Sequence, residues 1–161
     1  MSALRSSLVL SVVTVGTFAG VLLAAALAVS PSLALLDAPD YVLVKQAQIR
    51  ILQVSMTLIS TAYTVFAVAV LVMQRKQRSR AVFRLTLAAR VLVVLALVYS
   101  GPTDIAYNQD ILRWDPASPP ARWSEVRDAW DFSNRVRTVP SMRAFVLQTV
   151  ALLHVPPPTA A

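Results

Sequence analysis

The sequence predicts an all-α integral membrane protein, a four-helix bundle with a polar extracytoplasmic loop between its third and fourth helices. Hydrophobic residues make up 57% of the 161 residues and charged residues only 14%, with a mean hydropathy of +0.62. A soluble domain usually has about 25% charged residues. The apolar residues also gather in long runs, which is typical of membrane spans. We therefore expect residues 1–161 to form a single transmembrane domain.

The first two predicted spans, residues 8–36 and 51–73, contain no charged residue. Each is long enough to cross a hydrocarbon core of about 30 Å. The first run is longer than the apolar region of a usual signal peptide, so we expect it to remain as an uncleaved span. Gly16 and Gly20 form a GxxxG pattern in it. This pattern predicts close approach of a neighbouring helix, within the chain rather than between two chains.

The third and fourth predicted spans, residues 81–99 and 136–155, are less apolar than the first two. Arg90 lies near the middle of the third span and Arg143 lies within the fourth. A charge at this depth costs at least about 2.5 kcal/mol, so both side chains should face the bundle interior and have a partner. We therefore expect functional roles for these two arginines.

The charges between the spans predict the orientation. Residues 74–80 hold four basic residues and no acidic one, which predicts a cytoplasmic segment and two cytoplasmic termini. Residues 101–135 then form an outer loop with six acids and four bases. Because this pattern explains the net charge of +7, we expect a lipid bilayer as partner and no nucleic acid. The richness in Ala, Val and Arg favours a bacterial plasma membrane, and a homo-oligomer remains open.

The residues that the chain lacks narrow its chemistry. It has no cysteine and a single histidine, His154. This excludes disulfides, thiolate nucleophiles, iron–sulfur ligation and multi-histidine metal sites within one chain. We therefore expect no metal and no cofactor.

Polar and aromatic side chains concentrate in the outer loop and at the start of the fourth span. At 100° per residue, one helical face would carry an indole, two amides, a guanidinium and a hydroxyl, provided that Pro140 does not interrupt the helix. These residues are Trp130, Asn134, Arg137, Ser141 and Gln148. Arginine offers planar donors to an oxyanion, and the nearby carboxylates are candidate bases. For each tryptophan, an aromatic belt at the membrane interface is an equally good interpretation.

One part of the chain is similar to a known family. Asn108 follows the third apolar run, Trp114 comes soon after, and residues 130–138 read Trp-Asp-Phe-Ser-Asn-Arg-Val-Arg-Thr. This pattern resembles the DUF1772, or anthrone oxygenase-like, family of small four-helix membrane proteins. Its members have an asparagine and a tryptophan in these places and an Asn-His-Val-Arg-Thr stretch that enters the fourth span. Arg135 stands where that histidine is expected.

The resemblance implies a role in aromatic polyketide tailoring, because fungal relatives are associated with oxidising anthrones to anthraquinones. The resulting prediction is a cofactor-independent oxygenase acting on an apolar small molecule. One alternative is a membrane-bound cyclase, isomerase or epoxide-opening enzyme that uses the same residues without dioxygen. A second alternative is a non-enzymatic carrier or transporter subunit.

Two groups of site residues follow from these arguments. The expected catalytic residues are Asp104, Asn108, Asp128, Asn134 and Arg137. The expected substrate-binding residues are Arg90, Tyr107, Trp114, Trp123, Trp130, Ser141 and Arg143.

Overall fold

The computed structural model describes residues 3–77 and 80–155, and all regular structure in these ranges is helical. This confirms the predicted all-α fold. The helical elements are α1 (Ala3–Ala24), the π-helical segment η1 (Ala25–Val29), α2 (Ser30–Leu33), α3 (Ala38–Gln77), α4 (Arg80–Arg113) and α5 (Trp123–Leu153).

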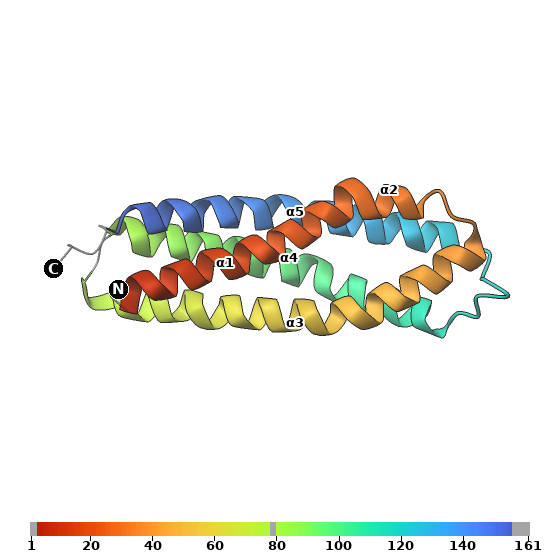
Figure 1. Ribbon diagram of the computed structural model, residues 1–161, viewed down its shortest axis with the longest axis horizontal. Helices are drawn as coiled ribbons and strands as arrows, with labels where there is room; N and C mark the ends of the chain where they lie inside the picture. The colour runs from red at the N-terminus through yellow and green to blue at the C-terminus, as the bar shows by residue number, and fades with distance from the viewer. Residues whose placement is uncertain (1–2, 78–79, 156–161) are drawn as a thin grey trace.

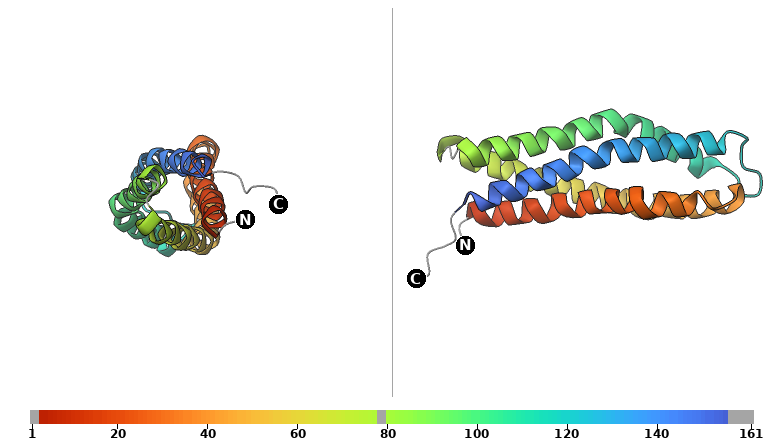
Figure 2. Two further views of the ribbon diagram at one scale, coloured as in Figure 1. Left: turned by 90° about the vertical axis from the view of Figure 1, so that its left-hand side faces the viewer. Right: turned by 90° about the horizontal axis from the view of Figure 1, so that it is seen from above.

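The elements α1, η1 and α2 follow one another along one side of an elongated bundle, beside α3, α4 and α5 (Figure 1). Seen along its length, α1 lies next to α3 and α5, and α4 also lies next to α3 and α5 (Figure 2). Helices α3 and α5 are therefore diagonally opposite. Residues 34–37 and 114–122 connect helices at one end, here termed the loop end. Helix α1 begins and α5 ends at the other end, here termed the terminal end.

Three stretches in the described part of the chain are long and apolar enough to cross a membrane: Ala3–Leu33, Ala38–Arg75 and Ala81–Tyr99. This finding is consistent with a membrane protein, and it confirms that the first three predicted spans are long and apolar. Helix α5 is also long, but its mean hydropathy is lower because charged and polar residues recur along it. A fourth span over residues 136–155 therefore stays a prediction.

The helices extend beyond the predicted spans. Helix α3 already begins at Ala38, where the Asp37 carboxylate accepts a hydrogen bond of 3.0 Å from the Asp40 backbone N–H and caps the first turn. Helix α4 continues through Pro102, and α5 begins at Trp123. Most of the predicted outer loop 101–135 is thus helical, and only residues 114–122 connect α4 with α5. The 40 residues of α3 rise about 60 Å, about twice the hydrocarbon core.

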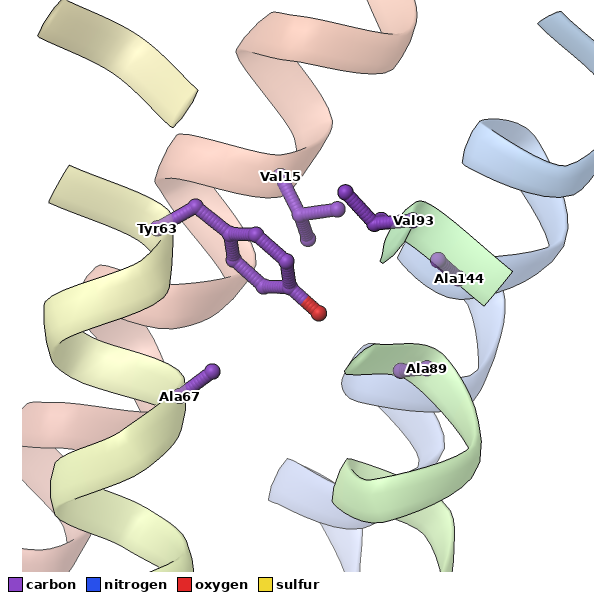
Figure 3. Packing of buried hydrophobic residues seen from close by; sticks show 6 residues of the cluster. All are labelled: Val15, Tyr63, Ala67, Ala89, Val93 and Ala144. Carbon is purple, nitrogen blue, oxygen red and sulfur yellow. The ribbon is translucent and has the colours of Figure 1, made fainter. Parts of the chain in front are cut away.

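The middle of the bundle is packed with small and β-branched residues around one aromatic ring. The Tyr63 ring extends from α3 toward α4 and α5 and is only 1% exposed (Figure 3). It belongs to a buried cluster with Val15, Ala67, Ala89, Val93 and Ala144. This cluster closes the bundle interior below the polar residues of the loop end.

The two glycines of the GxxxG pattern differ in their surroundings. A Cβ atom on Gly16 would lie 2.8 Å from Cε2 of Phe145 on α5, whereas nothing lies within 4 Å of a Cβ on Gly20. The close approach at Gly16 is therefore made within the chain, between α1 and α5.

Candidate functional site

A cavity of about 280 Å³ lies within the half of the bundle nearer the loop end. Residues of α1, η1, α3, α4 and α5 line it, and most of the surface of its wall is apolar. Its volume is near the lower limit of about 300 Å³ for small-molecule sites. The polar and charged lining residues are Lys45, Gln48, Gln53, Thr57, Ser60, Asp104, Asn108, Trp130, Asn134 and Arg137.

The cavity opens sideways between α3 and α4. None of the lining residues from α1 and α5 is exposed, and two of them, Leu22 and Asn134, are only 3% and 1% exposed. In contrast, Leu52 on α3 is 39% exposed and Ile105 on α4 is 58% exposed. These exposed apolar residues flank the opening, so it faces the lateral surface of the bundle, in helices that are apolar enough to cross a membrane.

A buried ion pair between Asp104 and Arg137 joins α4 to α5 at the cavity wall. Nη1 of Arg137 donates to Oδ2 of Asp104, and Nη2 donates to Oδ1 of Asn134 at 3.4 Å. Asp104 is 3% exposed, yet its Oδ1 and the Nε of Arg137 are buried without a partner among the described residues. Buried polar atoms of this kind are nearly always hydrogen-bonded in proteins. The pair therefore leaves one acceptor and one donor unsatisfied inside the protein, beside the cavity that both residues line.

Asn134 is held in place by the backbone of α1. Its Nδ2 donates to the Leu22 carbonyl at 3.4 Å, and the Thr138 hydroxyl donates to the same carbonyl at 3.4 Å. The hydroxyl of Thr138 also donates to the Asn134 carbonyl at 2.7 Å. These bonds fix the amide oxygen of Asn134 where it can accept from Arg137.

Trp130 on α5 also lines the cavity. Its Nε1 donates to Oδ1 of Asn108 at 3.0 Å, which fixes the orientation of the indole. The Nζ of Lys45 lies 3.0 Å from the centroid of its ring, and Cζ of Arg137 lies 5.7 Å from it. Both cations are thus in cation–π range of one aromatic ring.

Five predicted site residues line the cavity together: Asp104, Asn108, Trp130, Asn134 and Arg137. Because α5 is continuous through Pro140, the face predicted from helical spacing exists. Ser141 and Gln148 lie on it and are fully buried, although neither lines the cavity. The Ser141 hydroxyl donates to the Arg137 carbonyl at 2.8 Å and so serves its own helix.

The other predicted residues lie elsewhere. Asp128 is 68% exposed and pairs with Arg127 at 2.8 Å, and Arg143 is exposed. Tyr107 and Trp114 pack beside a buried apolar cluster, and Trp123 contacts Tyr41 with ring centroids 5.4 Å apart. These aromatic side chains pack against apolar and aromatic residues at the loop end and do not line the cavity.

Arg90 faces the bundle, as its depth predicts. Its Cζ lies 5.7 Å from the centroid of the Tyr63 ring, and its Nη1 is buried without a partner among the described residues. It does not line the cavity. The structure therefore does not bring Arg90, an expected substrate-binding residue, to the cavity that Arg137 lines.

The residues contributed by α3 were missed by sequence reasoning. Lys45 and Gln48 lie in residues 37–50, between the first two predicted spans, and both line the cavity. The missed signal is a helical spacing that runs without interruption from Lys45 through Ile49, Leu52 and Met56 into the second span.

No group of three or more His, Cys, Asp or Glu side chains in the described ranges could hold a metal ion. No known protein family, curated protein or solved structure matches the chain.

Proposed function

We propose that the chain is a membrane-embedded tailoring enzyme that acts on an apolar, enolisable aromatic or polyketide substrate by cofactor-independent, anthrone-type oxygenation. One observation carries the proposal. Asp104 and Arg137 both line a mostly apolar cavity, and their buried ion pair leaves one carboxylate oxygen and one guanidinium N–H unpaired beside it. A base beside an oxyanion donor, away from bulk water, is what abstraction of a proton next to a carbonyl requires.

In the proposed reaction, Oδ1 of Asp104 takes a proton from the activated CH₂ group beside the substrate carbonyl. The electron pair moves onto the carbonyl oxygen, and the Nε–H of Arg137 stabilises the resulting enolate. The enolate carbon then reduces dioxygen and forms a C–O bond. Protonation by Asp104 gives a hydroperoxide, and loss of water leaves a new carbonyl. The net change is CH₂ plus O₂ to C=O plus H₂O.

The surrounding residues have supporting roles in this proposal. Asn134 orients the Arg137 guanidinium, and Asn108 holds the Trp130 ring as one wall for a planar substrate. The similarity of Asn108 and residues 130–138 to the anthrone oxygenase-like family supports the assignment. Arg135, in the position of the family's histidine, is exposed and does not line the cavity, so its side chain is not needed there.

We also propose four membrane spans, with α5 as the fourth, and both termini in the cytoplasm. Support comes from the bundle, because α1 begins, α3 ends, α4 begins and α5 ends at the terminal end (Figure 1). The basic segment 74–80 connects α3 to α4 at this same end. If the terminal end is cytoplasmic, four crossings put the loop end on the outer side of the membrane. The cavity, which lies nearer the loop end, would then be close to the outer surface.

The test is mass spectrometry of products formed by the purified protein in detergent under labelled dioxygen, with a chelator present. Polyphenolic anthrones and linear polyketides are the candidate substrates. We expect one labelled oxygen atom in the product and its loss in Asp104→Asn and Arg137→Ala. The matched control is Asp40→Asn, which removes an exposed carboxylate at the start of α3. An unlabelled product of unchanged mass would instead establish a cyclase or isomerase, and absence of any product would favour a carrier.

A further inference from the structure

The charges at the cavity wall do not balance. The charged lining residues are the cations Lys45 and Arg137 and the carboxylate Asp104. Arg137 and Asp104 neutralise each other in an ion pair. Lys45 is 3% exposed and forms no ion pair with a carboxylate in the part of the chain that the structure describes. The buried Lys45 ammonium thus lacks a direct anionic partner among the described residues, and the Asp131 and Asp104 carboxylates act on it only through space.

The contact with Trp130 does not neutralise this charge. A cation over an aromatic ring gains about 2 kcal/mol when desolvated, whereas burying an ammonium group costs several kcal/mol. Buried charges in proteins are paired with opposite charges or coordinate ions. The Lys45 ammonium has three N–H donors, and one aromatic ring does not engage all of them. Lys45 also lines a cavity that is large enough for a small molecule.

The position of Lys45 along α3 shows how the charged and uncharged lining residues are distributed along the cavity. Lys45 and Gln48 lie toward the start of α3, before the uncharged run 51–73. Apart from Ile49, the other α3 lining residues, from Leu52 to Ser60, lie within that run. The cavity therefore has a charged end toward the loop end and an uncharged end level with the hydrocarbon core. Its opening between α3 and α4 connects both ends with the lateral surface of the bundle.

We propose that the cavity binds a monoanionic amphiphile, with an ionised oxygen acid of the ligand on Lys45 and its apolar body between α3 and α4. The ionised group is a carboxylate or an acidic phenol, separate from the carbon that reacts at Asp104. This assignment rests on the proposed function for calling the ligand a substrate, but the binding itself does not require turnover. The ligand enters sideways from the bilayer, since the lining residues that are exposed lie on α3 and α4.

The experiment measures binding by fluorescence quenching. In a Trp114→Phe/Trp123→Phe protein, Trp130 is the remaining tryptophan, and bromine on a bound molecule quenches it at short range. Three probes share one ring system: a bromonaphthoate, its methyl ester and the cationic bromonaphthylmethylamine. Each is titrated in detergent, and the apparent affinity is corrected for partition of the probe into protein-free micelles.

We expect the carboxylate to bind at least about tenfold more tightly than the ester, and the amine to show no saturable quenching. Lys45→Met should remove the preference for the carboxylate, and Lys45→Arg should retain it. Arg135→Met is the matched control, because it removes an exposed cation from α5 that does not line the cavity and should leave the preference unchanged.

Equal affinity of the unsubstituted site for acid and ester would overturn the inference, and so would a preference that survives in Lys45→Met. Both results leave the proposed oxygenation intact. Conversely, a Lys45-dependent carboxylate preference together with no product in the oxygen-labelling experiment would sustain the binding site and overturn the enzyme.

Discussion

Lys45 and Trp130 connect two helices that lie diagonally opposite in the bundle, with Nζ of the lysine 3.0 Å from the centroid of the indole ring. The contact therefore crosses the bundle interior at the level of the cavity. The same ring is fixed from α4 by the hydrogen bond to Asn108. Three helices thus meet at one indole, and the polar residues of the site depend on its position.

Substitution of Trp130 should separate the two contributions of its side chain. Trp130→Phe keeps a ring under Lys45 but loses the N–H donor, so the free energy of unfolding should fall by about 1 kcal/mol. Trp130→Leu also loses the cation–π contact and should cost about 2 kcal/mol more. Thermal or denaturant unfolding in detergent measures both. The same two substitutions at Trp114, which packs in apolar surroundings, report the loss of aromatic area alone. An equal Phe-to-Leu difference at both positions would contradict a role for the cation.

The Asp104–Arg137 pair should be costly to break and nearly neutral to replace. Asp104→Leu and Arg137→Met each leave a buried charge without its partner, which typically costs about 3–5 kcal/mol. The double variant removes both charges and should recover most of this loss, because an apolar pair suits an apolar bundle. Unfolding of the four proteins of this cycle gives the coupling. Additive losses in the double variant would show that the two residues are independent.

The GxxxG pattern gives a matched pair of substitutions in α1. Gly16→Leu places a side chain where Phe145 already lies 2.8 Å from a Cβ position, so α1 and α5 must move apart. Overpacking of this kind costs about 1–3 kcal/mol or more. Gly20→Leu meets open space and should change stability by only about 0.5 kcal/mol. If both variants lose the same stability, the packing of α1 on α5 at Gly16 is not tight.

The proposed orientation can be tested by cysteine labelling, because the chain has no native cysteine. Ser118→Cys lies in the connection 114–122, and Ser79→Cys lies in the basic segment 74–80. A membrane-impermeant maleimide should label the first variant in intact cells. The second should react only after the membrane is permeabilised. The reverse pattern would place the loop end and its cavity in the cytoplasm.

Periodicity in the sequence predicted the part of the site that lies on single helices. Trp130, Asn134 and Arg137 share the inner face of α5, and Asp104 and Asn108 share one face of α4. A regular helix makes such groupings certain once it is continuous. Their meeting across two helices depends on how α4 and α5 pack, and spacing along the chain contains no information on this.

The differences between the sequence predictions and the structure arise because the helices extend further than hydropathy indicated. Charge and proline at residues 37–50 and 101–135 suggested connectors, yet the capped start of α3 and the passage of α4 through Pro102 make these segments helical. Lys45 was therefore not considered, while Asp128 was placed in the site although its helical register turns it to the surface. Hydropathy detects the membrane-crossing part of a helix and not the part that projects beyond it.

With the proposed entry between α3 and α4, occupancy of the cavity depends on the ligand concentration in the bilayer rather than in water. For a molecule that reaches the cavity through the hydrocarbon layer, binding depends on its mole fraction in the bilayer and not on its concentration in water. Adding protein-free lipid vesicles at constant total ligand would then dilute the ligand in two dimensions and empty the cavity by mass action. A more apolar ligand would gain occupancy simply by accumulating in the membrane, with no additional contact in the protein.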